Sequence, residues 1–335
     1  MLCLLFYAAA AASAQEEPLQ AFRNGEALAL VPFADSARLE LPGGRSLRLN
    51  LPQGATVSSF AALDGGWIAA GSAPTATGGR HLFLLQGDEK SSRSVAEPPG
   101  QEGLQRRRPV LLVDGGRLAG LAWLEGDGDT SLAVRSAAWT GRRWQAPQRV
   151  SFPGPGSQVA LSGAVLDDGS WLLAWSAFDG TADEIVWSQR VGDAGGTWLP
   201  VRRVSERNAV PDIVPAVTAT AGGGALLAWS RYDGRSYQLR MARFDHGEWR
   251  NEHAAGPTGS LYPTFLGEPD RPRLLYMDAY PRAWSVLDLD TAGRVKARAS
   301  ISSPLDRPVV SFAGGEVRMR WTGRKTSATR LEKVP

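Results

Sequence analysis

Three side chains of the sequence could together bind an acidic ligand: the guanidinium groups of Arg108 and Arg307 and the phenol of Tyr262. Each of these residues directly precedes a proline and a short apolar segment, in RPVLLV, RPVVSF and YPTFL. Two arginines that converge on one point suit a carboxylate, because a planar guanidinium can donate to both carboxylate oxygens. Glu206 and Asp212 are the best carboxylates for the same site. These residue types predict the recognition of an acidic small molecule.

The residues can be compared because the chain repeats itself from Arg107 onward. The clearest copies are RPVLLVDGGRLAGLAWLEGDGD, ALSGAVLDDGSWLLAWSAFDG and VPAVTATAGGGALLAWSRYDG. Each copy has a short apolar strand, a glycine-rich turn and a second strand that ends in Ala-Trp. Its tryptophans, Trp123, Trp175 and Trp229, are 52 and 54 residues apart. Four strands in a repeat of this length are typical of a propeller blade.

The repeat also locates the start of the innermost strand of each blade. Counting 13 or 14 residues back from the aromatic residue of the second strand gives its first residue, and the residues just before that point are Arg108, Ala160, Val214, Tyr262 and Arg307. Innermost strands surround the central channel of a propeller. These five residues are therefore predicted to share one mouth of the channel.

Fainter copies extend the repeat in both directions. Residues 55–99 predict a blade upstream, 262–303 predict one downstream, and the segment after Arg307 offers three strands without a fourth. PLQAF, shortly after Gln15, could supply the missing outer strand and close a ring of seven blades, with six blades as the alternative. Helical periodicity is lacking, and 38 glycines and 22 prolines punctuate the strands. We expect one all-β domain over residues 15–335, a β-propeller of four-stranded antiparallel blades closed by N- and C-terminal strands.

The segment DAGGTW, from Asp193 to Trp198, has the composition of a tight turn between strands. The carboxylate can accept turn N–H groups, Gly195 tolerates a positive φ, and the indole can fold back over the sheet. Together with Thr197 these residues form D-x-G-x-T-W and resemble the Asp-box, or BNR repeat, of the sialidase superfamily, with Val191 where the fuller motif has serine. The chain is similar to a degenerate member, and the resemblance implies that the box is a structural turn remote from the catalytic centre.

The resemblance also implies a catalytic interpretation of the site. In sialidases three arginines hold the substrate carboxylate, a tyrosine paired with a glutamate is the nucleophile, and an aspartate is the acid/base. Arg108 and Arg307 would stand for two of the arginines, and Asp212 would be a further ligand-binding residue. Tyr262 would be the nucleophile, and Glu206 would assist it. The third arginine and the aspartate near the first blades have no counterpart.

Each candidate also has a structural explanation. An arginine before a strand can pair with a neighbouring carboxylate, as Arg307 could with Asp306, and Tyr262 could pack at a blade junction. The aligned tryptophans are predicted to pack between blades. Two main interpretations stay open: a ligand-binding or protein-interaction module with its ligand at the channel mouth, or an exo-acting glycoside hydrolase of the sialidase type. A polysaccharide lyase or another propeller enzyme is a third.

Composition argues against several other functions. The net charge is only +3 over 335 residues, so a nucleic-acid partner is not expected. His81, His246 and His253 are scattered without zinc-type spacing, and the sequence has neither a Gly-x-Ser-x-Gly elbow nor a phosphate loop. We expect no metal and no cofactor, and a monomer whose partner is an acidic carbohydrate or a protein.

The first fourteen residues, MLCLLFYAAAAASA, are apolar and end in Ala12-Ser13-Ala14, which fits signal-peptidase cleavage before Gln15. The stretch is too short to span a bilayer, and no transmembrane segment is expected in the mature chain. Cys3 is the single cysteine and would leave with the peptide, so disulfides are not expected. Residues 1–14 are thus predicted to be a signal peptide of a periplasmic or secreted bacterial protein, with a retained N-terminal anchor as the alternative.

Overall fold

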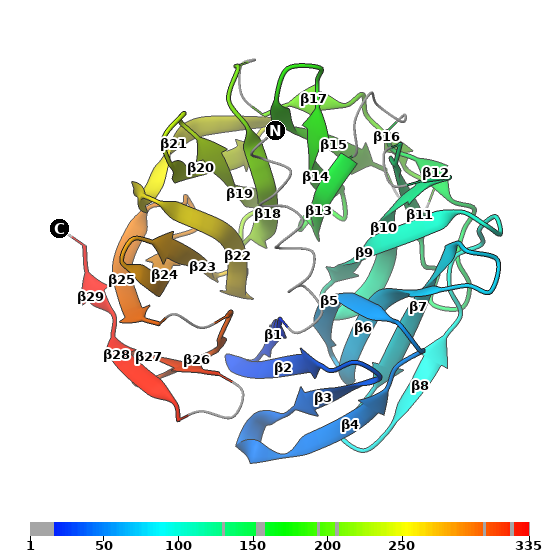
Figure 1. Cartoon of the computed structure of the whole chain (residues 1–335), viewed down its shortest axis with the longest axis horizontal. Coiled ribbons are helices and arrows are strands. Elements are labelled where there is room, and N and C mark those ends of the chain that lie inside the picture. Colours follow the sequence, from blue (N-terminus) through cyan, green and yellow to red (C-terminus); the bar gives the residue numbers. More distant parts are fainter. Residues whose placement is uncertain are drawn as a thin grey trace.

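The computed structural model describes residues 17–128, 131–151, 158–192, 195–204, 208–303, 306–321 and 325–334. Within these ranges the elements are β-strands, apart from one short 3-10 helix, Pro42–Gly44. Figure 1 shows the strands as radial sheets around a centre, with the blue start of the chain beside its red end. The fold is an all-β β-propeller, as the repeats predict. None of the described residues form a helix of the length and hydropathy needed to cross a membrane.

The first half of the chain builds two sheets. The first contains β1 (Leu19–Arg23), β2 (Glu26–Pro32), β3 (Ser36–Glu40) and β4 (Ser46–Asn50). The second contains β5 (Thr56–Leu63), β6 (Gly66–Pro74), β7 (Arg80–Gly87) and β8 (Ser92–Val95), followed by β9 (Gln105–Asp114), β10 (Arg117–Gly126), β11 (Ala133–Ala138) and β12 (Gln148–Arg149). One parallel residue pair, Arg80 with Gln105, joins the two series into one eight-stranded sheet.

The second half of the chain forms four sheets. The third sheet contains β13 (Gln158–Val165), β14 (Trp171–Phe178), β15 (Asp183–Val191), β16 (Thr197–Trp198) and β17 (Arg202–Arg203). The fourth contains β18 (Asp212–Thr220), β19 (Gly224–Tyr232), β20 (Tyr237–Asp245) and β21 (Glu248–Thr258). The fifth contains β22 (Ser260–Glu268), β23 (Arg271–Ala279), β24 (Arg282–Leu289), β25 (Val295–Ser302) and β29 (Glu332–Lys333), and the last contains β26 (Val309–Ala313), β27 (Glu316–Arg320) and β28 (Ser327–Arg330).

The number of sheets differs from the expectation. Hydrogen bonding gives six sheets in the described part of the chain, and five of them have four or more strands. Seven four-stranded blades, or six, are therefore not confirmed. Two predicted blades merge because β7 and β9 approach closely enough to pair. The last repeat keeps three strands, and two other sheets gain a fifth strand.

The expected closure by pairing of terminal strands is also wrong. PLQAF lies in β1, which pairs with β2 in the first sheet instead of completing the last one. The reason is local: the three segments that follow it supply antiparallel partners, so β1 needs none from the C-terminus. Side chains join the two ends. The Gln20 amide donates to the Val310 carbonyl at 2.8 Å and accepts from the Val310 N–H at 2.9 Å. Arg320 also forms an ion pair with Glu40.

The core lies between neighbouring sheets. Four tryptophans of the second strands are fully buried: Trp67, Trp123, Trp175 and Trp229. Each belongs to an apolar cluster that contains residues of two series of strands, as Trp123 does with Ile68 and Leu84 of the preceding series. The prediction that the aligned tryptophans pack between blades is confirmed.

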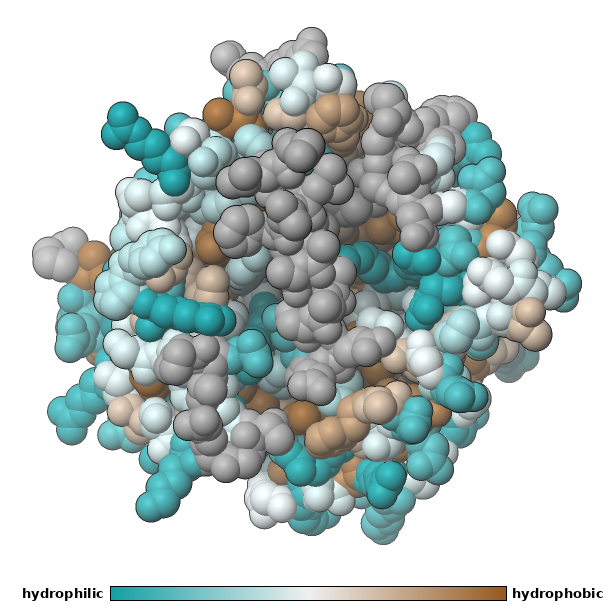
Figure 2. Space-filling model, viewed as in Figure 1, coloured by the Kyte–Doolittle hydropathy of each residue, from teal (hydrophilic) through white to brown (hydrophobic). Residues whose placement is uncertain are grey.

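On the face in Figure 2, hydrophobic and hydrophilic residues are interspersed wherever the surface is coloured.

Candidate functional site

The innermost strands β9, β13, β18 and β22 each carry a β-bulge near their start, where the register with the second strand shifts. The bulge residues are Arg108, Ala160, Val214 and Tyr262, and their φ angles are +48°, +54°, +55° and +55°. Side chains with a Cβ rarely adopt this conformation, which costs on the order of 1–3 kcal/mol for each residue. The count along the repeats therefore identified four structurally equivalent and strained positions.

A large aromatic residue lies in the second strand opposite each bulge. These residues are Trp123, Trp175, Trp229 and Tyr276. The bulge gives the first strand one extra residue and bends it, and its recurrence shows that the bend belongs to the fold. The residue type at the bulge varies, however, from guanidinium to phenol. Because β9, β13, β18 and β22 contact one another in this order around the centre (Figure 1), the four bulges lie at one mouth of the ring.

Arg307 does not occupy an equivalent bulge. β26 begins two residues later, at Val309, and pairs with β27 without a register shift. The Arg307 side chain is only 14% exposed, and its Nη1 lies 3.7 Å from Oε2 of Glu17. Its Nη2 donates to the Thr264 hydroxyl of β22. Burial lowers the pKa of the Arg307 guanidinium, whereas the Glu17 charge raises it. The carboxylate beside Arg307 is thus Glu17, and not Asp306 as the sequence suggested.

Tyr262 belongs to the same cluster, which we name the Glu17 cluster: Glu17, Tyr262, Thr264 and Arg307. Burial raises the pKa of the half-buried Tyr262 phenol, and the nearby Glu17 charge raises it further, while Arg282 opposes both. The phenol is therefore neutral at neutral pH and can donate a hydrogen bond. Arg307 thus contacts the strand that carries Tyr262, and the charge of Glu17 acts on both side chains. Sequence reasoning missed Glu17 because it precedes the first strand and has no counterpart in the repeats.

Arg108 is placed differently from Arg307. It is exposed, and it makes no hydrogen bond or ion pair with any residue in the described ranges. No contact joins it to the Glu17 cluster within those ranges. In the order of strands around the ring, the bulges of Ala160 and Val214 separate Arg108 from Tyr262. The mouth therefore presents a guanidinium and a phenol with two small apolar residues between them.

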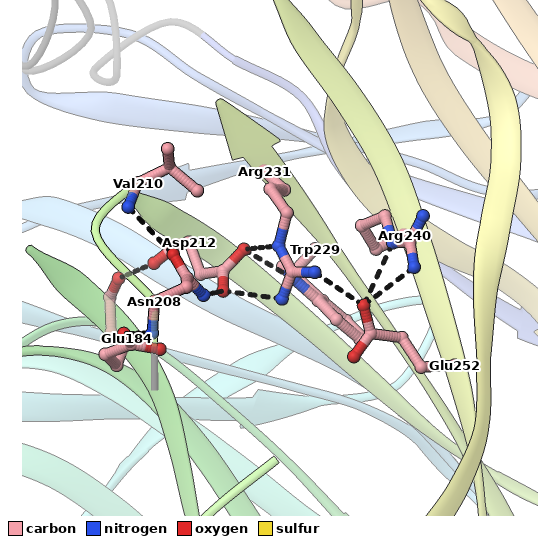
Figure 3. A network of polar contacts seen from close by, with 9 residues as sticks. Glu184, Asn208, Val210, Asp212, Trp229, Arg231, Arg240 and Glu252 are labelled. Carbon is pink, nitrogen blue, oxygen red and sulfur yellow. Dashed lines mark hydrogen bonds and ion pairs between the residues drawn. The ribbon is translucent and has the colours of Figure 1, made fainter. Parts of the chain in front are cut away.

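Asp212 lies at the start of β18, and its side chain is fully buried. Figure 3 shows its carboxylate in a network with Arg231, whose Nε and Nη2 donate to the two oxygens at 2.7 and 2.8 Å. The Trp229 indole donates to Oδ1 at 2.9 Å, and the Asn208 amide donates to Oδ2 at 3.2 Å. The carboxylate charge is neutralised inside the protein. This network fixes the start of β18 two residues before the bulge at Val214.

The β9–β11 series, on the other side of the β13–β17 sheet, contains a related network with its charges exchanged. Relative to the bulge at Arg108, Arg106 stands where Asp212 stands in β18, and Glu125 stands where Arg231 stands in β19. The Arg106 Nε lies 3.5 Å from Glu125 Oε2, and the Trp123 indole donates to the same oxygen at 3.0 Å. An ion pair therefore lies next to the bulge in both series, with the acidic residue on the innermost strand in one and on the second strand in the other. Because each pair contains one positive and one negative charge, it adds no net charge to the mouth.

Glu184 of β15 is a second buried carboxylate beside Asp212 (Figure 3), and sequence reasoning missed it. The Asn208 N–H donates to its Oε1 at 3.2 Å, but its Oε2 is buried without a partner among the described residues. Burial raises the pKa of this carboxyl, and the Asp212 charge adds to the effect, although the Asn208 N–H lowers it. Glu206, the expected partner of Tyr262, lies outside the described residues. Nothing in the sequence marked Glu184, because alternation with Ile185 and Trp187 assigns it to the other face of β15, where a glutamate is expected to be exposed.

Thr197 and Trp198 of the D-x-G-x-T-W segment form β16, whereas Asp193 falls outside the described residues. Gly195 and Thr197 are exposed. The Trp198 indole donates to the Ser136 hydroxyl of β11 at 2.8 Å and contacts the edge of Trp171 at 6.3 Å. Trp198 thus links two sheets. This position and these contacts indicate a structural role for the described part of the segment.

Comparisons with known proteins match this architecture. No family model and no curated protein match the chain. Among solved structures, virginiamycin B lyase from Staphylococcus aureus is similar, with a TM-score of 0.56, 11% identity and 96% of each chain covered. An ulvan lyase bound to -[GlcA(1-4)Rha3S]- has a TM-score of 0.54 at 10% identity, over 93% of this chain and 91% of that one. The fucose-containing complex of Aleuria aurantia lectin has a TM-score of 0.50 at 11% identity, over 95% and 96%. These likenesses concern the fold.

Proposed function

We propose that this chain is a carbohydrate-binding β-propeller that holds an acidic sugar at the mouth formed by the bulges of β9, β13, β18 and β22. One observation carries the proposal: Arg108 and Tyr262 occupy equivalent bulges on either side of Ala160 and Val214. Arg108 is exposed and has no partner in the described ranges, so it can receive a ligand carboxylate. The neutral Tyr262 phenol can exchange hydrogen bonds with ring hydroxyls.

Other residues of the described chain support this site indirectly. Arg307 forms an ion pair with Glu17, and the charge of Glu17 helps to raise the pKa of the Tyr262 phenol. Asp212 anchors β18, the strand that carries Val214. Two of the similar folds, a lectin in complex with Fucα1-6GlcNAc and a lyase bound to -[GlcA(1-4)Rha3S]-, belong to proteins that bind glycans. These likenesses favour the carbohydrate class and leave the sugar to be identified.

Titration of the purified chain with methyl glucuronide and with N-acetylneuraminic acid tests the proposal. Arg108→Ala should weaken binding at least about tenfold, which is the loss of about 1.4 kcal/mol. Tyr262→Phe should weaken it less, because one hydroxyl is removed. Arg117→Ala is the matched control, since this arginine is exposed at the other end of the β9–β10 hairpin. Binding that is equal in Arg108→Ala and Arg117→Ala would refute the site.

A sialidase-type glycoside hydrolase is the second candidate, and the effect of the Glu17 charge on the Tyr262 phenol favours it. A carboxylate beside a phenol could accept its proton as the phenol attacks an anomeric carbon. The raised pKa of Tyr262 works against attack, because it disfavours the phenolate. Turnover of a fluorogenic sialoside that Tyr262→Phe abolishes would establish the hydrolase. If the parent protein binds the acidic sugar but does not hydrolyse the sialoside, the hydrolase candidate is refuted and the binding function is retained.

We also propose export of the chain, to the periplasm or beyond, because residues 1–14 end in Ala12-Ser13-Ala14. These residues lie outside the described part of the structure. Mass spectrometry of the chain recovered from a bacterial periplasm should give a new N-terminus at Gln15. Recovery of the intact N-terminus in a membrane fraction would favour the retained anchor.

A further inference from the structure

A cavity of about 240 Å³ lies between the β9–β12 series and the third sheet. Its lining combines two indoles, two carboxylates, a guanidinium and an amide: Trp139, Trp171, Asp114, Asp168, Arg190 and Gln145. Neither the repeats nor the mouth assign these residues a function. Pockets that bind small molecules typically combine aromatic walls with a few polar groups in this way.

The cavity is remote from the mouth. β9 runs from Gln105 to Asp114, with Arg108 near its start and Asp114 at its end. Six residues of extended strand span about 20 Å. Asp168 likewise follows the end of β13, whereas the bulge at Ala160 is near the start of that strand. The cavity therefore lies at the opposite end of the sheets and can bind a ligand independently of the mouth.

A buried cation supports the aromatic wall of the cavity. Arg190 of β15 is only 3% exposed, and its guanidinium lies 4.4 Å from the centre of the Trp171 ring. Burial lowers the pKa of Arg190. Trp139 is partly exposed and packs against Trp144 at 4.9 Å. The cavity thus has one indole stacked on a cation and a second indole that keeps exposed surface for a ligand.

The charges around the cavity argue against an anionic occupant. Asp114 and Asp168 are exposed carboxylates that would repel an anion, and the Arg190 guanidinium is buried against the Trp171 ring. Asp168 uses one oxygen to accept the Ser170 N–H at 2.9 Å. Carboxylates and the Gln145 amide can accept and donate hydrogen bonds around the rim of a polyol. The apolar face of an indole suits the C–H face of a sugar ring.

We infer that this cavity binds a single neutral sugar ring of the pyranose type, with its C–H face on Trp139 and its hydroxyls on Asp114, Asp168 and Gln145. Size supports one ring and not a chain, because sites for drug-sized ligands occupy roughly 300–1,000 Å³. The inference does not depend on the proposed acidic-sugar mouth. The protein would then hold two saccharide sites of different charge preference at its two ends.

Saturation-transfer NMR and titration with neutral methyl glycosides of glucose, galactose and fucose test this inference. Methyl glucuronide and glucosamine serve as the anionic and cationic probes. At least one neutral glycoside should bind, and Trp139→Ala and Asp168→Asn should each weaken it at least about tenfold. Gln145→Ala is a second, milder variant in case the loss of Trp139 disturbs its packing on Trp144.

The control is Asp167→Asn, because Asp167 neighbours Asp168 but bonds to the Gly222 and Gly223 N–H groups of the next sheet. Binding that falls equally in Asp167→Asn and Asp168→Asn would overturn the inference, as would exclusive binding of charged sugars or failure of all neutral probes. Arg108→Ala separates the two sites. Loss of neutral-sugar binding in that variant alone would assign the sugar to the mouth and refute the cavity.

Discussion

At the scale of single residues, buried carboxylates organise the end of the sheets that carries the bulges. Asp212 accepts hydrogen bonds from Arg231, Trp229 and Asn208, so burial of its charge is compensated. Glu184, nearby, has one oxygen without a partner among the described residues. The two groups should therefore respond to substitution in opposite ways.

Asp212→Ala should lower the free energy of unfolding by about 3–5 kcal/mol, because it removes one partner of a buried ion pair and leaves the Trp229 indole N–H unpaired. Urea denaturation of the variant measures the loss. Asp64→Ala is the control, because its carboxylate is exposed and 4.0 Å from Arg117, and it should change stability by less than about 0.5 kcal/mol. Equal losses in both variants would contradict the role of the network.

Glu184→Gln should stabilise the protein increasingly as the pH rises. The raised pKa of Glu184 in the folded state means that its contribution to stability is present below the ordinary value of about 4.3 and is lost as pH rises through the folded pKa. Glutamine cannot ionise, and it keeps an oxygen for the Asn208 N–H. Melting temperatures of the variant and the parent should differ little near pH 4 and diverge by about pH 8. A difference that is independent of pH would show that Glu184 does not titrate as we expect.

At the scale of elements, the repeated unit is a bulged innermost strand that faces a large aromatic residue in the second strand. The bulge forces a non-glycine residue into a left-handed conformation at four equivalent positions. At the bulge of β13 the strained residue is Ala160, whose side chain is only a methyl group. The strained conformation at this position therefore does not serve to orient a ligand-binding side chain.

Ala160→Gly should raise the free energy of unfolding, by up to about 1 kcal/mol, because glycine adopts a φ of +54° without strain. Chemical denaturation compares it with Ala174→Gly, a fully buried site in β14 without positive φ. The latter should destabilise by about 0.5–1 kcal/mol or more through lost packing and added chain entropy. Destabilisation by both substitutions would argue that the bulge at Ala160 carries no strain.

At the scale of the whole molecule, the junction between the first and last sheets differs from the others. Elsewhere, apolar clusters such as that of Trp175 with Leu112 and Val134 join adjacent series of strands. At the closure, Gln20 forms two hydrogen bonds to the Val310 backbone, and Phe22 packs on Phe312 with ring centres 5.8 Å apart. The side-chain amide of Gln20 thus forms the two hydrogen bonds with Val310 that the backbone of a neighbouring strand would otherwise form. Comparable single bonds occur at other junctions, where the Ser162 hydroxyl accepts from Val217 N–H.

Gln20→Ala should lower the free energy of unfolding by about 1–3 kcal/mol, because two hydrogen bonds are lost at once. It should also speed exchange of the Val310 amide hydrogen, which loses its acceptor. Ser162→Ala removes one bond at another junction and should cost about half as much. Unchanged exchange at Val310 would mean that the closure does not depend on Gln20.

The sequence by itself determined the repeated local structure. Alternating apolar residues, glycine turns and the Ala-Trp spacing are local signals, so they located the strands, the buried tryptophans and four bulge positions. The fifth position failed because the count assumes a bulge, and the last repeat has a short innermost strand that pairs without one.

Tertiary structure alone decided how these units meet. The pairing of Arg80 with Gln105 and the Gln20 clamp on Val310 join segments whose own sequences give no sign of each other. Glu17 meets Arg307 for the same reason. Contacts between distant residues depend on which surfaces the packed sheets bring together, whereas strand periodicity and turn chemistry depend on a few neighbouring residues.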